Sequence, residues 1–447
     1  MLKLNKSVIL SLFCNLFHYY AFSIYAFSAV ILAPIFFHIE SQELTRILGL
    51  ITLSILLLLK PLGGIVFGHI GDRYGRKVAL TFSLVAITIS TTCIGLIPSF
   101  EYIGWFSSVT LMICLFIQGM CMGGQSTGSI IFIQEHTKKH NAAFSCALMI
   151  TMGVFGTLLG TATSFLSYHL GGLRWEWRLP FLLTSIMGIC LYFLMKNMQE
   201  TPVFAESKNK SDIKKIPLVN IIKNHKKTLC AAIFISSIPV SMFYLATVYM
   251  PNFYGSEDRM SNPSFSLILV CLAQILCMIF IPLFGYIADK LGKETQLKVT
   301  SILLILSPIF VFYGMSIYNN TYFLIFGIII LSIFASLYSG PAPAFLSEKF
   351  PVVGRFSGMG LSIAIGEGLF GGLSPIICVG IEQIFQSKIA PAYFIMFLGM
   401  ISFSGVLILR KKTASFLEDK VMNTPQVSNL LAETYSIKLK KFNSNLS

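Results

Sequence analysis

Charged residues are scarce in this sequence. Asp, Glu, Lys and Arg make up 12% of its 447 residues, whereas a soluble domain carries about 25%. Hydrophobic residues make up 55%, and the mean hydropathy is +0.76. This leaves too little polar surface to cover a water-soluble globule. The composition therefore predicts a protein whose main solvent is the lipid bilayer, in which each spanning helix needs about 20 apolar residues.

Motifs that bind metals or nucleotides are also lacking. The ten cysteines all fall in apolar runs, and none forms a CxxC pair or joins histidines at metal-ligand spacing. No GxxxxGK[ST] loop for phosphate binding occurs. No polar segment is long enough to form a soluble catalytic domain. We therefore expect no disulfide, no metal, no cofactor, no direct use of ATP and no enzymatic activity.

Apolar runs are abundant, and twelve of them are long enough to span a bilayer. They cover roughly residues 9–37, 45–68, 79–98, 104–134, 143–168, 180–197, 228–252, 264–288, 298–317, 321–346, 356–383 and 391–410. With the N-terminus inside, 27 of the 33 Lys and Arg residues fall on the inner side, five on the outer side, and Lys60 within a span. This bias predicts that both termini are cytoplasmic in a plasma membrane. The net charge of +14 then reflects topology and attraction to anionic lipid, and no nucleic-acid partner is expected.

The longest internal polar stretch divides the spans into two sets of six. We expect a six-helix bundle over residues 1–198, a cytoplasmic linker over 199–227, a second bundle over 228–411 and a cytoplasmic tail over 412–447. The predicted fold class is an all-α integral membrane protein with two pseudo-symmetric bundles, and we expect a monomeric functional unit.

A charged motif occurs at the same place in each half. Residues 68–77 read GHIGDRYGRK after the second span, and residues 285–293 read GYIADKLGK after the eighth. Both fit GxxxD(R/K)xG(R/K). Two halves with the same loop chemistry indicate duplicated bundles, which is an architecture of transporters.

The chemistry of this loop predicts a conformational gate. Gly75 and Gly292 permit a tight reversal, and Asp72 and Asp289 can cap a helix N-terminus. The cations can pair with acids at the inner ends of neighbouring spans, with Glu135 and Glu348 as partners for Arg76, Arg73 or Lys290. The alternative is that short cytoplasmic loops are simply basic and rich in turns. The predicted gating residues are Gly68, Asp72, Arg73, Gly75, Arg76, Lys77, Gly285, Asp289, Lys290, Gly292, Glu135, Glu348 and Arg355.

Together with further blocks, this motif resembles the major facilitator superfamily, and within it the metabolite:proton symporter family. The blocks are KPLGGIVFGHIGDRYGRK, IQGMCMGGQSTGSIIFIQE, WEWRLPFLL…NMQETPVF, VYMPNFY and PAPAFLSEKFPVVGRFSGMGLSIAIGEGLFGGLSP. The resemblance covers most of residues 12–410. It implies alternating access to a central cavity lined by the first and fourth helices of each half. It also implies proton symport across a bacterial inner membrane, with proline/betaine, α-ketoglutarate, citrate and shikimate among the solutes of the family.

The chain departs from this family where charge is usual. His18 stands where the family has Glu, and Ala21 where it has Asp. Leu115 replaces an Arg, and Gln125 replaces a Glu. These changes motivate an alternative, a facilitator that has lost proton coupling. The proline pattern of antiporters in this superfamily is absent from the fifth span, which favours symport.

Three ionisable residues within spans are functional candidates, because charge in a membrane is costly. Glu367, in the middle of SIAIGEGLFGG, is a candidate to carry the coupling proton, and the alternative is a neutral, hydrogen-bonded side chain in a helix contact. His18 is a candidate proton relay, and the alternative is a satisfied core histidine. Lys60 either extends toward the membrane surface or pairs with an acid.

Aromatic and amide side chains complete the candidate substrate cavity. An aromatic wall suits a quaternary ammonium or a zwitterion, although the chain is 13% aromatic throughout. Uncharged glutamines favour polar or zwitterionic solutes over multiply charged ones. The cavity candidates are Tyr19, Tyr20, Tyr25, Lys60, Gln118, Gln125, Tyr244, Tyr249 and Gln274.

We therefore expect proton-coupled symport of a small polar metabolite, in particular a compatible solute such as proline or betaine. The expected partners are this solute, the proton and the bilayer. The alternatives are uptake of a carboxylate such as α-ketoglutarate, citrate or shikimate, an uncoupled facilitator and, more remotely, a transporter-like sensor.

Overall fold

The computed structural model describes residues 6–38, 42–171, 175–209, 217–253, 263–318, 321–352 and 354–422. Twelve helical segments in these ranges are long and apolar enough to cross a membrane, and no strand occurs in them. The predicted all-α membrane fold with twelve spans is confirmed.

The first six spans form the N-terminal bundle. Its elements are α1 (Lys6–Phe36), α2 (Gln42–Leu58), α3 (Lys60–Arg73), α4 (Arg76–Leu96), α5 (Phe100–Ile103), α6 (Trp105–His136), η1 (Lys139–Asn141), α7 (Ala142–Gly171), η2 (Glu176–Arg178) and α8 (Leu179–Lys196). The second span is interrupted at Leu59 between α2 and α3, and Pro61 lies in the first turn of α3. Proline is tolerated there because the first helical amides have no partner within the helix.

Two short helices follow in the linker, and six further spans form the C-terminal bundle. The linker helices are α9 (Pro202–Asn209) and α10 (Pro217–Asn224). The bundle contains α11 (Lys226–Tyr244), η3 (Leu245–Tyr249), α12 (Met250–Phe253), α14 (Pro263–Leu291), α15 (Lys293–Leu306), α16 (Pro308–Tyr318), α17 (Thr321–Ser339), α18 (Ala342–Lys349), α19 (Arg355–Ile365), η4 (Gly366–Gly371), α20 (Ser374–Phe385) and α21 (Pro391–Met422). α21 extends to Met422, within the tail expected over residues 412–447, and residues 423–447 lie outside the described part of the chain.

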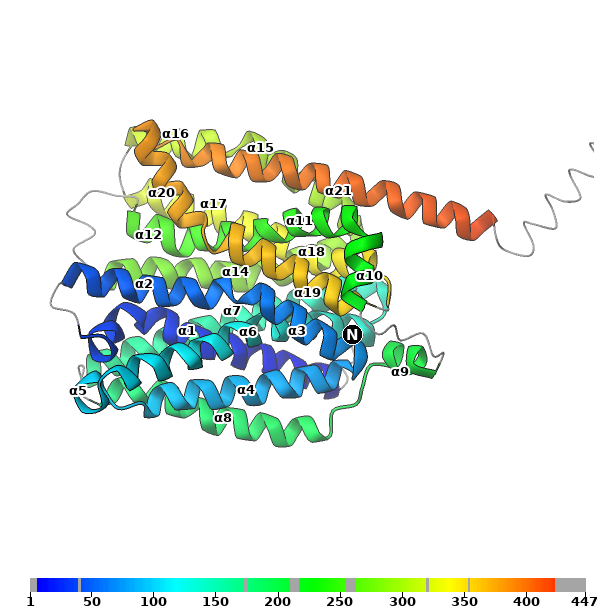
Figure 1. Cartoon of the computed structure of the whole chain (residues 1–447). Coiled ribbons are helices and arrows are strands. Elements are labelled where there is room, and N and C mark those ends of the chain that lie inside the picture. Colours follow the sequence, from blue (N-terminus) through cyan, green and yellow to red (C-terminus); the bar gives the residue numbers. More distant parts are fainter. Residues whose placement is uncertain are drawn as a thin grey trace, which may run out of the picture.

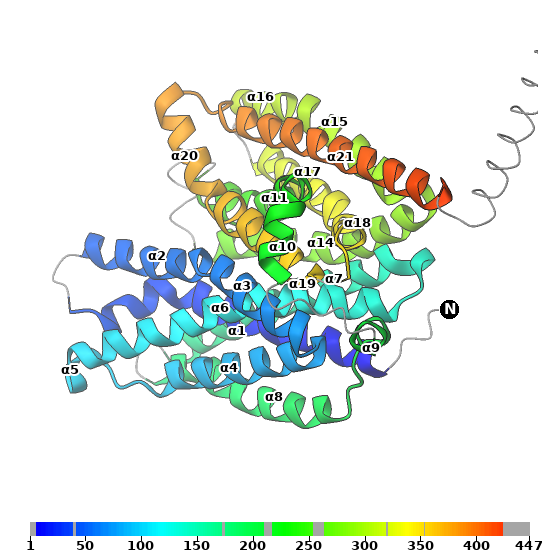
Figure 2. The same cartoon turned by 45° about the vertical axis from the view of Figure 1, so that its right-hand side comes forward.

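The two bundles lie side by side (Figure 2). The start of α1, the linker helices α9 and α10 and the far end of α21 all lie at one end of the helices (Figure 1). The C-terminal ends of α3 and α14, which carry Asp72 and Asp289, lie at this same end, which we call the motif end. The halves contact each other mainly through two helix pairs, α3 with α19 and α7 with α14.

Small residues allow these pairs to approach closely. A Cβ atom at Gly64 would lie 2.6 Å from the main-chain oxygen of Gly360, and one at Gly68 would lie 2.7 Å from the Cα atom of Ser357. In the second pair, a Cβ at Gly285 would lie 2.5 Å from the Cβ of Ala147. These distances are shorter than van der Waals contact. The glycines of the repeated motif therefore allow the backbones of the two halves to touch, as small residues do in membrane helix pairs generally.

Two spans of the C-terminal bundle contain a π-helical turn. These turns are η3, between α11 and α12, and η4, between α19 and α20. A π turn leaves main-chain groups outside the regular helical ladder, and in membranes such groups find partners on neighbouring helices. Here the Ser241 hydroxyl of α11 donates to the Phe370 carbonyl of η4, at 3.2 Å. The turn η4 carries Glu367, and its irregular backbone sets the position of that side chain.

Candidate functional site

Asp72, near the end of α3, caps a helix of the other half. Its Oδ1 accepts a hydrogen bond from the Phe356 amide at 3.2 Å. Its Oδ2 accepts from the Ser357 amide at 2.9 Å and from the Ser357 hydroxyl at 2.8 Å. These amides begin α19, where a negative charge is stabilised by the helix dipole and by otherwise unpaired N–H groups. Asp72 is only 5% exposed, so this cap lies inside the contact between the two halves.

Asp289 makes the matching contact in the opposite direction. Its carboxylate accepts from the Ala143 amide at 3.0 Å and from the Phe144 amide at 2.8 Å. These two residues begin α7 of the N-terminal bundle. Each motif aspartate therefore caps a helix of the other half, so the sequence repeat corresponds to a reciprocal pair of caps. Both caps require the halves to be closed together at the motif end.

A buried ionic cluster lies beside the first cap. Arg76 Nε is 3.3 Å from Glu135 Oε2, and Arg355 Nη1 is 3.1 Å from Glu135 Oε1. Arg76 Nη1 is also 3.7 Å from Asp72 Oδ1. The Thr201 hydroxyl donates to Glu135 Oε2 at 2.6 Å. Because Arg76 is only 1% exposed, its charge depends on these partners, and Arg355 ties the cluster to the C-terminal half.

The loop between α3 and α4 is held by a residue outside the predicted set. Gly75 has φ +117° and precedes α4, and Gly292 has φ +95° and precedes α15. The Glu200 carboxylate accepts hydrogen bonds from the amides of Arg76 and Lys77, each at 3.1 Å. Glu200 follows α8, more than 100 residues away in sequence, so no local pattern indicates this contact. Its only signal in the sequence is the family-like block NMQETPVF.

The remaining gating candidates make contacts other than those of this cluster. Glu348 pairs with Lys293 rather than with the expected Arg73 or Lys290. Arg73 is exposed and stacks on the neighbouring Tyr74 ring at 5.4 Å, and Lys290 lies 4.4 Å from the centre of a tyrosine ring on its own helix. The position explains the difference, since Lys293 begins α15 beside α18, on which Glu348 lies.

A second ionic contact between the halves lies deep in the membrane-spanning region. Lys60 Nζ is 3.1 Å from Glu367 Oε2, and the two side chains are 6% and 15% exposed. Lys60 lies in the middle of the span Ile51–Arg73, and Glu367 lies in the central part of the span Arg355–Phe385. Of the two interpretations of Lys60, the structure supports pairing with an acid.

Three further candidates lie within electrostatic range of this pair. Tyr19 of α1 and Tyr244 of α11 interact electrostatically with Glu367, and His18 of α1 interacts with Lys60. His18 is 2% exposed, and neither of its ring nitrogens has a hydrogen-bond partner within the described part of the chain. We call Lys60, Glu367, His18, Tyr19 and Tyr244 the central cluster.

Several other cavity candidates lie within the N-terminal bundle instead. The Tyr25 hydroxyl donates to Thr52 Oγ1 at 2.7 Å, and the Gln118 amide donates to Thr91 Oγ1 at 3.0 Å. Gln125 Oε1 accepts from a serine hydroxyl of α4. The helical period explains why Tyr25 does not lie beside Tyr19. Six residues turn a helix by about 240°, so the two side chains point in different directions.

The last three candidates are also separate from the central cluster. Tyr20 lies 3.5 Å from the Pro180 carbonyl in the core of the N-terminal bundle. Tyr249 of η3 donates to Glu382 of α20 at 2.9 Å. Gln274 is buried in α14. In this conformation, the structure thus brings together five of the predicted intramembrane residues and places the others elsewhere.

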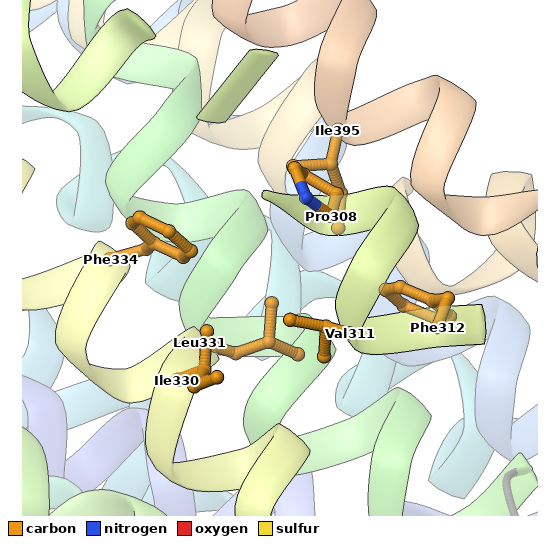
Figure 3. Close-up of a pocket in the computed structure, with 7 residues that line it drawn as sticks. All are labelled: Pro308, Val311, Phe312, Ile330, Leu331, Phe334 and Ile395. Carbon is orange, nitrogen blue, oxygen red and sulfur yellow. The ribbon is translucent and has the colours of Figure 1, made fainter. Parts of the chain in front are cut away.

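A small pocket in the C-terminal bundle is not a solute site. It lies between α16, α17 and α21 (Figure 3) and has essentially no room for a water-sized molecule. All its lining residues are apolar: Pro308, Val311, Phe312, Ile330, Leu331, Phe334 and Ile395. It offers no polar partner to a charged or zwitterionic molecule.

Comparison with known proteins gives a consistent result. The sequence model of the Major Facilitator Superfamily matches residues 11–375. The "Proline/betaine transporter" of Salmonella typhimurium is 29% identical over 414 residues, which cover 89% of this chain and 82% of that protein. The "Glycine betaine/proline/ectoine/pipecolic acid transporter OusA" of Dickeya dadantii is 28% identical over 443 residues, covering 96% and 87%. The structure of the proton:xylose symporter XylE superimposes with a TM-score of 0.74 at 15% identity, covering 91% and 95%.

Proposed function

The chain belongs to the Major Facilitator Superfamily, and on this premise we propose that it is a proton-coupled symporter for a compatible solute such as proline or betaine. The family and the twelve spans make it a multi-pass membrane transporter of small molecules. The solute is suggested by relatives that are named as proline/betaine transporters. We place it in a bacterial inner membrane with both termini cytoplasmic, because the inner loops then carry most of the Lys and Arg.

In this proposal the motif end is the cytoplasmic gate. The reciprocal caps of Asp72 and Asp289 and the cluster around Glu135 join the two halves. Alternating access requires these contacts to break when the cytoplasmic side opens and to re-form when it closes. Their polar character suits this use, because water can hydrate the groups in the open state.

The observation that carries the proposal of proton coupling is the Lys60–Glu367 pair. A carboxylate at mid-depth that is paired with a cation on the opposite half can exchange that partner for a proton as the halves move. His18, beside Lys60, is the candidate relay, because a buried imidazole with unpaired nitrogens can accept or pass on a proton.

Uptake by proteoliposomes tests this function. Glu367→Gln keeps the shape of the side chain but cannot carry a proton, so we expect exchange of solute across the membrane to persist while accumulation driven by a proton gradient is lost. Glu382→Gln is the matched control, since it is the same substitution in the same span, next to Tyr249. Undiminished accumulation by Glu367→Gln would contradict the assigned role.

An uncoupled facilitator is the second candidate. It is favoured by Gln125, which stands at a position where the symporter family has an acid and is hydrogen-bonded within the N-terminal bundle. Exchange without gradient-driven accumulation by the unmodified protein would support this candidate over symport.

A further inference from the structure

We propose that Lys60 binds the carboxylate of the transported solute, and that a proton on Glu367 is what releases Lys60 for this purpose. The inference rests on the proposed transport function and adds to it the chemical group that the carrier recognises. The starting observation is that the Lys60 ammonium has fewer hydrogen-bond partners than donors. That group has three N–H donors, and within the described residues Glu367 is its only hydrogen-bonding partner.

Among the described residues, the surroundings of the pair provide no replacement for Glu367. Within the described part of the chain, the ionisable groups that interact with the pair are Tyr19 of α1 and Tyr244 of α11, with Glu367, and His18 of α1, with Lys60. None of the three carries a negative charge at neutral pH. If Glu367 takes up a proton, the Lys60 ammonium is left in the membrane interior without a counter-ion, which is costly. An incoming carboxylate removes this cost.

This exchange couples the proton to the solute. Before binding, Lys60 and the Glu367 carboxylate form a neutral pair. After binding, Lys60 is paired with the solute carboxylate, and Glu367 carries the proton on one of its oxygens. When the site opens to the cytoplasm, the proton leaves Glu367, the ion pair re-forms, and the solute carboxylate is displaced. Proton and carboxylate therefore favour each other's binding, as symport requires.

The position of the pair limits the solute to small molecules with one carboxylate available. Lys60 and Glu367 lie on opposite halves, 3.1 Å apart, so a carboxylate that replaces Glu367 lies between α3 and η4. The rings of Tyr19 and Tyr244, which lie within electrostatic range of Glu367, are then available to the positive end of a zwitterion through cation–π attraction. Proline and betaine have both groups, whereas choline and prolinamide have a similar size and positive charge but no carboxylate.

Equilibrium binding to the purified full-length protein tests the inference separately from transport. We expect betaine and proline to displace labelled betaine at least about tenfold more effectively than choline and prolinamide, as for other sites that pair with a buried polar group. Binding should weaken as the pH rises, because Glu367 must be protonated. In Glu367→Gln, Lys60 is permanently free, so betaine should bind without this pH dependence.

Variants at Lys60 complete the test. Lys60→Gln should lose the preference for betaine over choline, whereas Lys298→Gln should keep it, because Lys298 pairs with Glu294 on its own helix, away from the central cluster. If Lys60→Gln does not fold, the double variant Lys60→Gln/Glu367→Gln leaves no unpaired charge and should show the same loss.

The outcomes separate the two proposals. Equal binding of betaine and choline, or retained preference without Lys60, overturns the inference, as does the absence of binding by every carboxylate offered. Carboxylate-selective binding without proton-driven accumulation supports the inference and refutes the proposed symport.

Discussion

The substitution Asp72→Asn tests whether the motif end is a gate. The side chain keeps its shape but loses its charge and one of the two oxygens that accept hydrogen bonds from the start of α19. We expect the closed state of this end to be destabilised, the open state to become more populated, and uptake to fall with no change in solute preference.

The structure sets the size of the effect. Hydrogen bonds to a charged group contribute about 1.5–3 kcal/mol, and a charge at a helix N-terminus contributes about 0.3–2 kcal/mol. Asn retains one acceptor, so a net loss of about 2–3 kcal/mol from the closed state is reasonable for a cap that is 5% exposed. Since 1.4 kcal/mol is a factor of ten, the equilibrium should shift about 30- to 150-fold toward opening.

Distances between spin labels measure this shift directly. Tyr74 and Leu291 are 58% and 68% exposed and lie at the motif end of different halves, so labels there should separate when the end opens. Asp289→Asn should act in the same direction but less strongly, because Asp289 accepts from two amides and lacks the additional hydroxyl bond. An unchanged distance distribution for Asp72→Asn, with normal uptake, would refute the gating role.

Two further predictions concern glycines. Gly75→Ala should lower the melting temperature in detergent and reduce uptake, because φ is +117° and the new methyl group would lie 2.2 Å from a Glu200 oxygen. Gly104→Ala is the control: φ is +57° there and no atom lies within 4 Å, so the fall in melting temperature should be smaller. An equal fall for both variants would refute the steric argument. Gly64→Ala should hinder closure of the motif end and reduce uptake, because its methyl group would lie 2.6 Å from a main-chain oxygen of α19. Gly380→Ala is the control, because its methyl group would lie in open space. Normal uptake by Gly64→Ala would contradict this expectation.

The chemistry of the gate could be predicted in part from sequence. Asp72 and Asp289 have the properties of helix caps in any context, and the repeat placed them at equivalent positions. The sequence could not show that each aspartate caps the opposite half, because this depends on how the bundles pack. For the same reason Glu200 was not in the predicted set, and Glu348 was matched with the wrong cation.

The intramembrane candidates illustrate a different limit. Charge within an apolar run marks Lys60 and Glu367 without any structure, because desolvation makes each of them costly. Their mutual contact joins residues about 300 positions apart and depends on the π turn that carries Glu367. Conversely, the sequence supports Tyr25 and Gln118 as cavity residues as strongly as it supports Tyr19. In the structure, the faces of their helices on which Tyr25 and Gln118 lie point into their own bundle.

The sequence by itself determined that this is a membrane protein of twelve spans in two related halves. Hydropathy and charge distribution are properties of local segments, and they determine directly which segments enter the bilayer and in which orientation. Only the tertiary structure decided which charges meet. Ion pairs and helix caps act over a few ångströms, and their partners come from two halves that meet where α3 packs on α19 and α7 packs on α14.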